Sequence, residues 1–123
     1  AAQQYALRLP TSFDLVHLGL GSDGHTASLV PGDDVLGVTD RLVAPTSSTY
    51  QGRRRMTLTY PALARAAQLL WLVVGTSKAG ALQKLIDGDE SIPAGRVTAG
   101  GSVIMADSSA APRKSEAVTL EEA

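Results

Sequence analysis

The chain has 123 residues, of which 44% are hydrophobic and 19% are charged, and its formal net charge is −1. This length and composition suffice for one domain with a hydrophobic core, and they exclude a disordered tail. The balanced charge argues against sequence-independent electrostatic binding of nucleic acid. The absence of cysteine excludes disulfides and thiolate metal sites. No apolar run is long enough to cross a bilayer and no signal-peptide pattern opens the chain, so we expect no membrane contact and a cytoplasmic location.

Short apolar runs alternate with segments of helical character along the chain. The apolar runs predict strands at 13–19, 42–44, 56–59, 69–74 and 102–106. The other segments predict helices at 1–9, 26–30, 61–67 and 78–86, a Ser/Thr-rich loop at 45–52 and a C-terminal tail at 112–123. This alternation predicts an α/β fold with a mostly parallel, Rossmann-like sheet flanked by helices. His17, Trp71 and Met105 are expected in its core.

The first predicted strand ends in a segment rich in glycine. Gly19, Gly21 and Gly24 let the backbone turn sharply and lie close to a ligand. Chain that leaves a strand in this way exposes amide N–H groups, which suit an anion or an oxyanion. His25 follows, and an imidazole can take or give a proton near neutral pH. A tight turn without a ligand would explain the glycines, but not the Asp23 and His25 beside them.

The three glycines also fit the dinucleotide-binding pattern Gly-x-Gly-x-x-Gly, which follows a strand and opens a helix. That fold requires a full crossover helix packed closely against the third glycine. Pro31 stops any helix soon after Gly24, and Asp40, at the separation expected of the ribose partner, stands before the next strand rather than after it. A dinucleotide site is therefore the weaker alternative.

Basic residues offer candidate phosphate ligands. Three arginines occupy positions 53–55 beside a predicted strand, and Lys78 stands in the first turn of a predicted helix. A guanidinium can fork onto a phosphate, and a lysine at a helix N-terminus is better tolerated when an anion lies between them. A solvated loop and a solvent-facing lysine are equally consistent with these residues. His17 and His25 lie on different elements and predict no metal site.

Several segments of the chain, in order, resemble the sequence signatures of the 6-phosphogluconolactonase family. These segments are residues 13–32, 55–63, 74–82, 93–96 and 107–111. The related glucosamine-6-phosphate deaminases share the first strand and the Asp23-Gly24-His25 motif. After the histidine they typically run into an Ile-Ala-Phe-Asn-Glu pattern, where this chain has Thr26-Ala27-Ser28. The resemblance is therefore to the lactonases first, and to the deaminases second.

The resemblance implies hydrolysis of 6-phospho-D-glucono-1,5-lactone to 6-phosphogluconate in the pentose phosphate pathway, without a metal or other cofactor. A lactone is an activated ester and needs a positioned water, a base and oxyanion stabilisation. By this resemblance His25 is the base that activates the water, and Asp23 orients the loop or the ring. The residues that would contact the phosphorylated substrate are Gly21, Gly24, Arg55 and Lys78, the last two at its phosphate.

Members of this family are about twice as long as this chain, and the resemblance covers their C-terminal half. We therefore expect residues 1–111 to be the C-terminal portion of a larger α/β domain, followed by the tail at 112–123. Without further strands, the first strand would expose a long apolar edge through which two copies could associate. Two alternatives to a lactonase stay open. One is an isomerase or deaminase of the glucosamine-6-phosphate type, and the other is a sugar-phosphate-binding fragment without catalysis.

Overall fold

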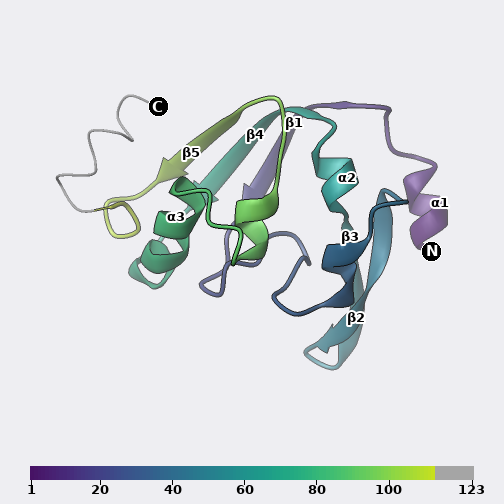
Figure 1. Ribbon diagram of the computed structural model, residues 1–123, viewed down its shortest axis with the longest axis horizontal. Coiled ribbons are helices and arrows are strands. Elements are labelled where there is room, and N and C mark those ends of the chain that lie inside the picture. The colour runs from purple at the N-terminus through teal and green to yellow at the C-terminus, as the bar shows by residue number, and fades with distance from the viewer. Residues whose placement is uncertain (113–123) are drawn as a thin grey trace.

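The computed structural model describes residues 1–112, so the predicted tail lies outside the described residues apart from its first position. At its centre is a parallel three-stranded sheet in the order β1-β4-β5 (Figure 1). Its strands are β1 (Phe13–Gly19), β4 (Ala66–Val73) and β5 (Ser102–Ala106). β2 (Val43–Tyr50) and β3 (Arg53–Leu58) form an antiparallel hairpin beside it. The predicted α/β class with a mostly parallel sheet is confirmed.

The helices are short and follow the local signals only in part. They are α1 (Ala2–Ala6), α2 (Tyr60–Leu63) and α3 (Ala79–Ile86), with 3-10 turns η1 (Asp34–Gly37), η2 (Thr76–Lys78) and η3 (Pro93–Arg96). Thr59 caps α2 by accepting the Ala62 amide, and Pro61 stands in its first turn. α2 is shorter than predicted, because β4 already begins at Ala66 in register with Phe13.

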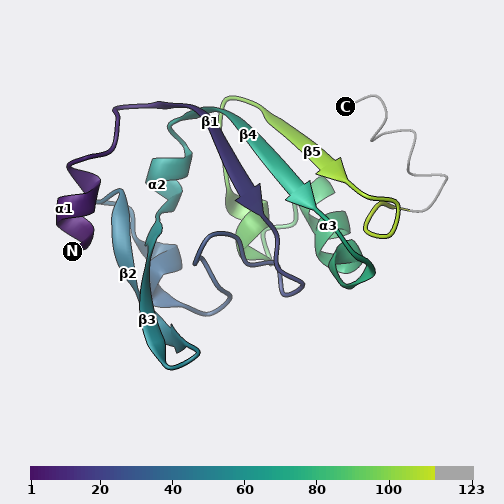
Figure 2. The same cartoon turned by 180° about the vertical axis from the view of Figure 1, so that it is seen from behind.

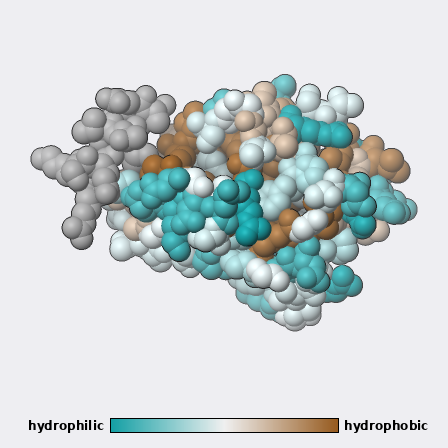
Figure 3. Space-filling model, viewed as in Figure 1, coloured by the Kyte–Doolittle hydropathy of each residue, from teal (hydrophilic) through white to brown (hydrophobic). Residues whose placement is uncertain are grey.

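One face of the parallel sheet is covered. α3 and η3 lie in front of it in Figure 1 and behind it in Figure 2, so both pack on the same side. Alternate residues of β4 point into this layer, and Leu69, Trp71 and Val73 are almost fully buried. The prediction that Trp71 belongs to the core is confirmed. From this side the surface is a mixture of hydrophilic and hydrophobic residues (Figure 3).

The opposite face, seen in Figure 2, carries no helix of the described residues. Apolar side chains on the strands are exposed there, with 55% of Leu15, 47% of Leu72 and 55% of Met105 accessible. His17 lies in phase with Leu15 on β1 and is exposed too. The predictions that His17 and Met105 are core residues are therefore wrong, because the sheet has a core on one side only.

Two predictions about secondary structure, at residues 26–30 and 45–52, are also wrong. The segment predicted as a helix at 26–30 is a tight turn, with an isolated bridge between Thr26 and Leu29 and a φ of +51° at Ala27. The Thr26 hydroxyl donates a hydrogen bond to the Gly19 carbonyl at 2.8 Å, which ties the turn back to β1. Such side-chain bonds compete with helix formation.

The second wrong prediction is the Ser/Thr-rich loop, which is most of strand β2. Its backbone groups pair with β3, and the local sequence alone does not indicate this pairing. The two strands join at Gln51 and Gly52, with φ of +53° and +76°. Two successive positive φ values are typical of the two-residue turns that match the twist of a hairpin.

Candidate active site

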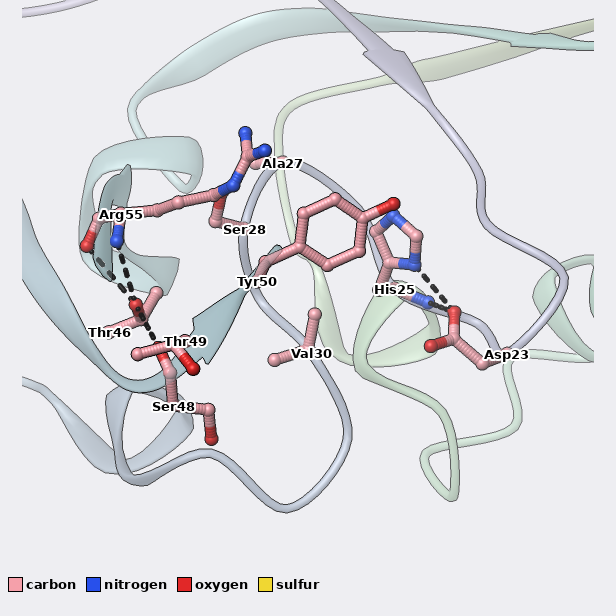
Figure 4. A pocket seen from close by; sticks show the side chains of 10 residues that line it. All are labelled: Asp23, His25, Ala27, Ser28, Val30, Thr46, Ser48, Thr49, Tyr50 and Arg55. Carbon is pink, nitrogen blue, oxygen red and sulfur yellow. Dashed lines mark hydrogen bonds and ion pairs between the residues drawn. The ribbon is translucent and has the colours of Figure 1, made fainter. Parts of the chain in front are cut away.

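His25 and Asp23 lie on the loop after β1 and form a close pair. Asp23 Oδ1 is 2.6 Å from His25 Nδ1 and accepts the His25 backbone N–H at 3.0 Å. Both side chains reach solvent, with 39% of His25 and 54% of Asp23 exposed. The carboxylate thus holds the ring through one nitrogen, and Nε2 is on the side of the ring away from Asp23 (Figure 4).

The charge state of Asp23 decides which nitrogen of the ring carries the proton. Burial raises the pKa of the Asp23 carboxyl, but hydrogen bonds from the backbone and ring of His25, and the charge of His25, outweigh burial and hold this pKa below its ordinary value. An ionised carboxylate can only accept hydrogen bonds, so Nδ1 must be the donor. In a neutral imidazole Nε2 then keeps its lone pair and can accept a proton.

Glycine is required at two positions of this loop for steric reasons. A Cβ at Gly21 would lie 2.1 Å from His25 Nδ1, so the imidazole fits only because that atom is missing. Gly24 has a φ of +87°, and a Cβ there would lie 2.4 Å from the Cβ of Ile92. The Gly21 amide donates to the His25 carbonyl at 2.8 Å, and the Gly24 amide donates to the Gly21 carbonyl at 2.9 Å. In this structure both amides are thus used within the loop.

Lys78 meets the same loop from the junction of η2 and α3. Its Nζ donates a hydrogen bond to the Leu20 carbonyl at 2.6 Å, immediately before Gly21. The lysine is half-buried, and it is not among the residues that line the pocket described below. The helix that was predicted at 78–86 therefore does bring its first cation to the glycine loop.

The opposite wall of the site is the β2–β3 hairpin, which carries Arg55. The register of the hairpin shifts between Pro45 and Thr49, so a bulge in β2 lies opposite Arg55. The Thr46 hydroxyl accepts a hydrogen bond from the Arg55 amide at 3.1 Å and donates one to the Ser48 carbonyl at 2.9 Å. A bulge bends its strand and re-aims that strand's side chains, and here it brings the Thr46 hydroxyl onto the backbone of Arg55.

A buried aspartate from another segment holds this bulge. Asp33 accepts the amides of Ser47 at 3.0 Å and Ser48 at 2.9 Å, and also that of Val35 at 2.9 Å. Only 3% of Asp33 is exposed. Burial raises the pKa of its carboxyl, but the three amides outweigh burial and hold the pKa well below its ordinary value. The bulge is therefore pinned by a carboxylate that is ionised at neutral pH.

The structure separates the neighbouring arginines by their contacts. The Arg54 guanidinium donates from both Nε and Nη2 to the Thr46 carbonyl, each at 3.2 Å, and is tied to the strand. Among the described residues, no hydrogen bond or ion pair of this kind engages the Arg55 guanidinium, which lies over the ring of Tyr50, 4.7 Å from its centroid. Of the three arginines, Arg55 is the one that lines the pocket described below.

Both walls enclose one pocket of about 220 Å³ (Figure 4). Of the residues predicted from sequence, Asp23, His25 and Arg55 line it, while Gly21 and Gly24 support the loop behind and Lys78 stands apart. Sequence reasoning missed the lining residues of β2, which are Thr46, Ser48, Thr49 and Tyr50. Gly52, which stands between two runs that contain Thr, Tyr and Arg, was a weak signal of a turn there, because Gln-Gly is not among the usual hairpin-turn pairs.

The arrangement brings an imidazole, the carboxylate bonded to it and a guanidinium together around one small cavity. Within residues 1–112, no three His, Asp or Glu side chains come together in a way that could hold a metal ion. No helix in that same part of the chain has the length and apolar character needed to cross a membrane. The chemistry that these side chains themselves can perform is proton transfer beside a bound anion.

Comparison with known proteins relates the whole arrangement to one family. A family model described as glucosamine-6-phosphate isomerases/6-phosphogluconolactonase matches residues 1–105. The 6-phosphogluconolactonase of Synechocystis sp. is 47% identical over 74 residues, which are 60% of this chain and 30% of that protein. The 6-phosphogluconolactonase of Rattus norvegicus is 37% identical over 107 residues, which are 79% of this chain and 42% of that protein.

A solved structure agrees with these relatives. The crystal structure of 6-phosphogluconolactonase from Thermotoga maritima superposes with a TM-score of 0.74 at 31% identity, over 85% of this chain and 49% of that one. This chain thus spans between 30% and 49% of the length of the proteins named here. Since the family model covers nearly all described residues, the chain belongs to the glucosamine-6-phosphate isomerase/6-phosphogluconolactonase family.

Proposed function

We propose that this chain carries the catalytic end of a site that hydrolyses 6-phospho-D-glucono-1,5-lactone to 6-phosphogluconate. The observation that carries the proposal is the His25–Asp23 pair facing Arg55 across one pocket. A base and a cation on opposite walls suit a substrate with an electrophilic carbonyl at one end and a phosphate at the other. The names of the relatives from Synechocystis sp. and rat support the same reaction.

His25 acts as the general base in this proposal. Nε2 takes a proton from a water molecule while the water oxygen bonds to the lactone carbonyl carbon. The bond between that carbon and the ring oxygen then breaks, and the ring oxygen takes the proton to give the open-chain acid. Asp23 holds the ring through Nδ1 and stabilises the imidazolium that forms in between.

Two cations bind the substrate phosphate in the same proposal. Arg55 reaches it from the hairpin wall, where its guanidinium faces the pocket. Lys78 stands outside the pocket, beside the glycine loop, and would extend its ammonium group from there toward the same phosphate. A lysine ammonium has three donors, and the bond to Leu20 uses one of them. Binding energy from the remote phosphate would place the carbonyl for attack by water. The close packing of Gly21 and Gly24 would serve the position of His25.

The experiment is a lactone hydrolysis assay with the purified chain and its two single histidine variants. His25→Ala should lower turnover by at least about a hundredfold, because general base catalysis is typically worth that much. His17→Ala removes the other histidine, which is exposed on the open face of the sheet, and should leave turnover unchanged. Equal rates in wild type and His25→Ala would exclude this histidine as the base.

Two further measurements, combined with this assay, separate the two alternative functions. Release of ammonia from glucosamine 6-phosphate, with no hydrolysis of the lactone, would favour the deaminase reaction that the family name includes. Binding of 6-phosphogluconate without any turnover would favour a sugar-phosphate-binding module.

We also propose that residues 1–111 are part of a larger α/β domain and that this chain alone self-associates. The sequence predicts association at the edge of the sheet, where β1 is the last strand, and we propose that the open face beside this edge takes part. Leu15, Leu72 and Met105 are exposed there, although parallel sheets are ordinarily covered on both faces. Leu72→Glu should therefore convert dimers to monomers in sedimentation equilibrium. Leu7→Glu changes an exposed leucine that lies outside the sheet, and it should not. A wild-type chain that sediments as a monomer would contradict the proposal.

A further inference from the structure

Tyr50 occupies a place in the pocket that the proposed reaction does not yet use. It is the last residue of β2, and the two-residue turn after it returns the chain to β3. In Figure 4 its ring lies between the guanidinium of Arg55 and the imidazole of His25. The Arg55 guanidinium carbon is 4.7 Å from the ring centroid, within the range of a cation–π contact.

This contact leaves the hydrogen-bonding edge of Arg55 available. A guanidinium is planar, so its face can rest on an aromatic ring while its N–H groups point outward in the plane. Arg54 shows the alternative on the same strand, because its Nε and Nη2 both donate to the Thr46 carbonyl. An arginine stacked on an aromatic ring loses side-chain freedom before a ligand arrives, and this lowers the entropic cost of binding.

A simpler explanation is an incidental surface contact between two exposed side chains. The position of the pair argues against it, because both residues line the pocket that also contains His25 and Asp23. The hairpin bulge opposite Arg55 is held by buried Asp33, and its Thr46 accepts the Arg55 amide, so the backbone beneath the pair is held as well.

We propose that Tyr50 is a positioning residue that holds the Arg55 guanidinium ready for the phosphate group of the substrate. The inference rests on the proposed function for the identity of that substrate. It adds a residue that touches the cation and acts through it. Its role requires the aromatic ring, and the phenolic hydroxyl is dispensable.

The test is calorimetric titration of the full 123-residue chain with 6-phosphogluconate, with inorganic phosphate as a competitor. Tyr50→Ala should weaken binding by about twofold to fivefold, the range expected for an exposed cation–π contact. Tyr50→Phe keeps the ring and should bind as wild type does. Tyr5→Ala, on α1, is the matched control for loss of an exposed tyrosine and should have no effect.

A double variant separates positioning from a direct contact with the ligand. In an Arg55→Gln background, which itself should bind weakly, Tyr50→Ala should cause no further loss. Arg53→Ala removes a positive charge from the same strand outside the pocket and should leave the affinity near that of wild type. If Tyr50→Ala disturbs the hairpin in circular dichroism, Tyr50→Leu tests the same loss of the ring.

The results that overturn the inference are distinct from those that overturn the proposed function. Wild-type affinity in Tyr50→Ala or Tyr50→Leu, equal losses with and without Arg55, or no binding of either ligand to the wild-type chain would each overturn it. Binding that follows the expected pattern in a chain that does not hydrolyse the lactone would refute the proposed reaction and support the role of Tyr50.

Discussion

The two walls of the pocket are each held by one aspartate, but over very different stretches of chain. On the glycine-loop wall, Asp23 binds the backbone and ring of His25, two residues away. On the hairpin wall, Asp33 binds amides fourteen and fifteen residues further along, at Ser47 and Ser48. Asp23 is exposed whereas Asp33 is buried. One carboxylate therefore orients a single side chain, while the other holds two segments together.

This difference shows which aspartate contributes to the stability of the fold and which one mainly affects the reaction. A bond between exposed neighbours can be broken with little effect on folding, because water replaces the lost partner. A buried carboxylate that satisfies three amides cannot be replaced in that way. We therefore expect changes at Asp23 to act on the chemistry and changes at Asp33 to act on the fold first.

On the glycine-loop wall, Gly24 packs against distant chain at Ile92, and breaking this packing should have the largest effect on stability. A Cβ there would lie 2.4 Å from the Cβ of Ile92, and the φ of +87° is unfavourable for any other residue. Gly24→Ala should lower the free energy of unfolding by about 2–5 kcal/mol, the sum of backbone strain and overpacking. Urea denaturation measures this.

Gly32 is the matched control for that substitution. Its φ is +78°, but nothing lies within 4 Å of a Cβ built there. Gly32→Ala should therefore cost only the backbone strain, about 1–2 kcal/mol. Equal losses at both glycines would show that Ile92 moves aside and that its packing against Gly24 adds nothing to stability.

The same contrast explains how much of the site could be predicted from sequence. The glycine loop could be predicted because its residues lie together in the chain and end an apolar strand. The bulge around Thr46 could not, because it depends on Asp33 and on pairing with β3, and a Ser/Thr-rich segment resembles a loop when read alone. Among the arginines, Arg55 was placed by resemblance, and the bond between Arg54 and Thr46 adds a physical reason.

The strands and their exposure show a similar division. β1, β4, β5 and α3 follow from apolar runs and local stop signals, and each lies close to its predicted place. Sequence cannot tell whether the second face of a strand is covered, and Met105 and His17 were misplaced for that reason. The turn at 26–30 was missed because the hydroxyl of Thr26 bonds to β1 instead of allowing a helix.

On the hairpin wall, substitution of Asp33 should have the second-largest effect on stability. Asp33→Asn keeps the shape of the side chain but turns one acceptor oxygen into a donor that faces backbone amides. The variant should lose about 1–3 kcal/mol of unfolding free energy, the usual cost of a buried group left without its partner. It should also weaken binding of 6-phosphogluconate, because the bulge under Arg55 loosens. Unfolding and calorimetric titration measure the two effects.

The pH dependence provides a second check at this residue. The pKa of Asp33 is lowered in the folded chain, so its stabilising contribution is fully present above the pKa of an unfolded aspartate, about 3.9. That contribution is lost as the pH falls through the lower, folded-state pKa. The stability difference between wild type and Asp33→Asn should therefore shrink as the pH falls below about 4. A difference that stays constant down to the acid limit would show that Asp33 acts by shape alone.

The smallest effect on stability should come from the same substitution on the other wall, Asp23→Asn. The side chain is exposed and its partner is two residues away, so we expect a change within about 0.5 kcal/mol. Lactone hydrolysis should nevertheless fall strongly, because an amide can present its NH₂ group to Nδ1 and leave the imidazole in the wrong tautomer for accepting a proton at Nε2. Turnover measured beside thermal unfolding separates the two quantities. A large loss of stability with turnover preserved would reverse the division between the walls.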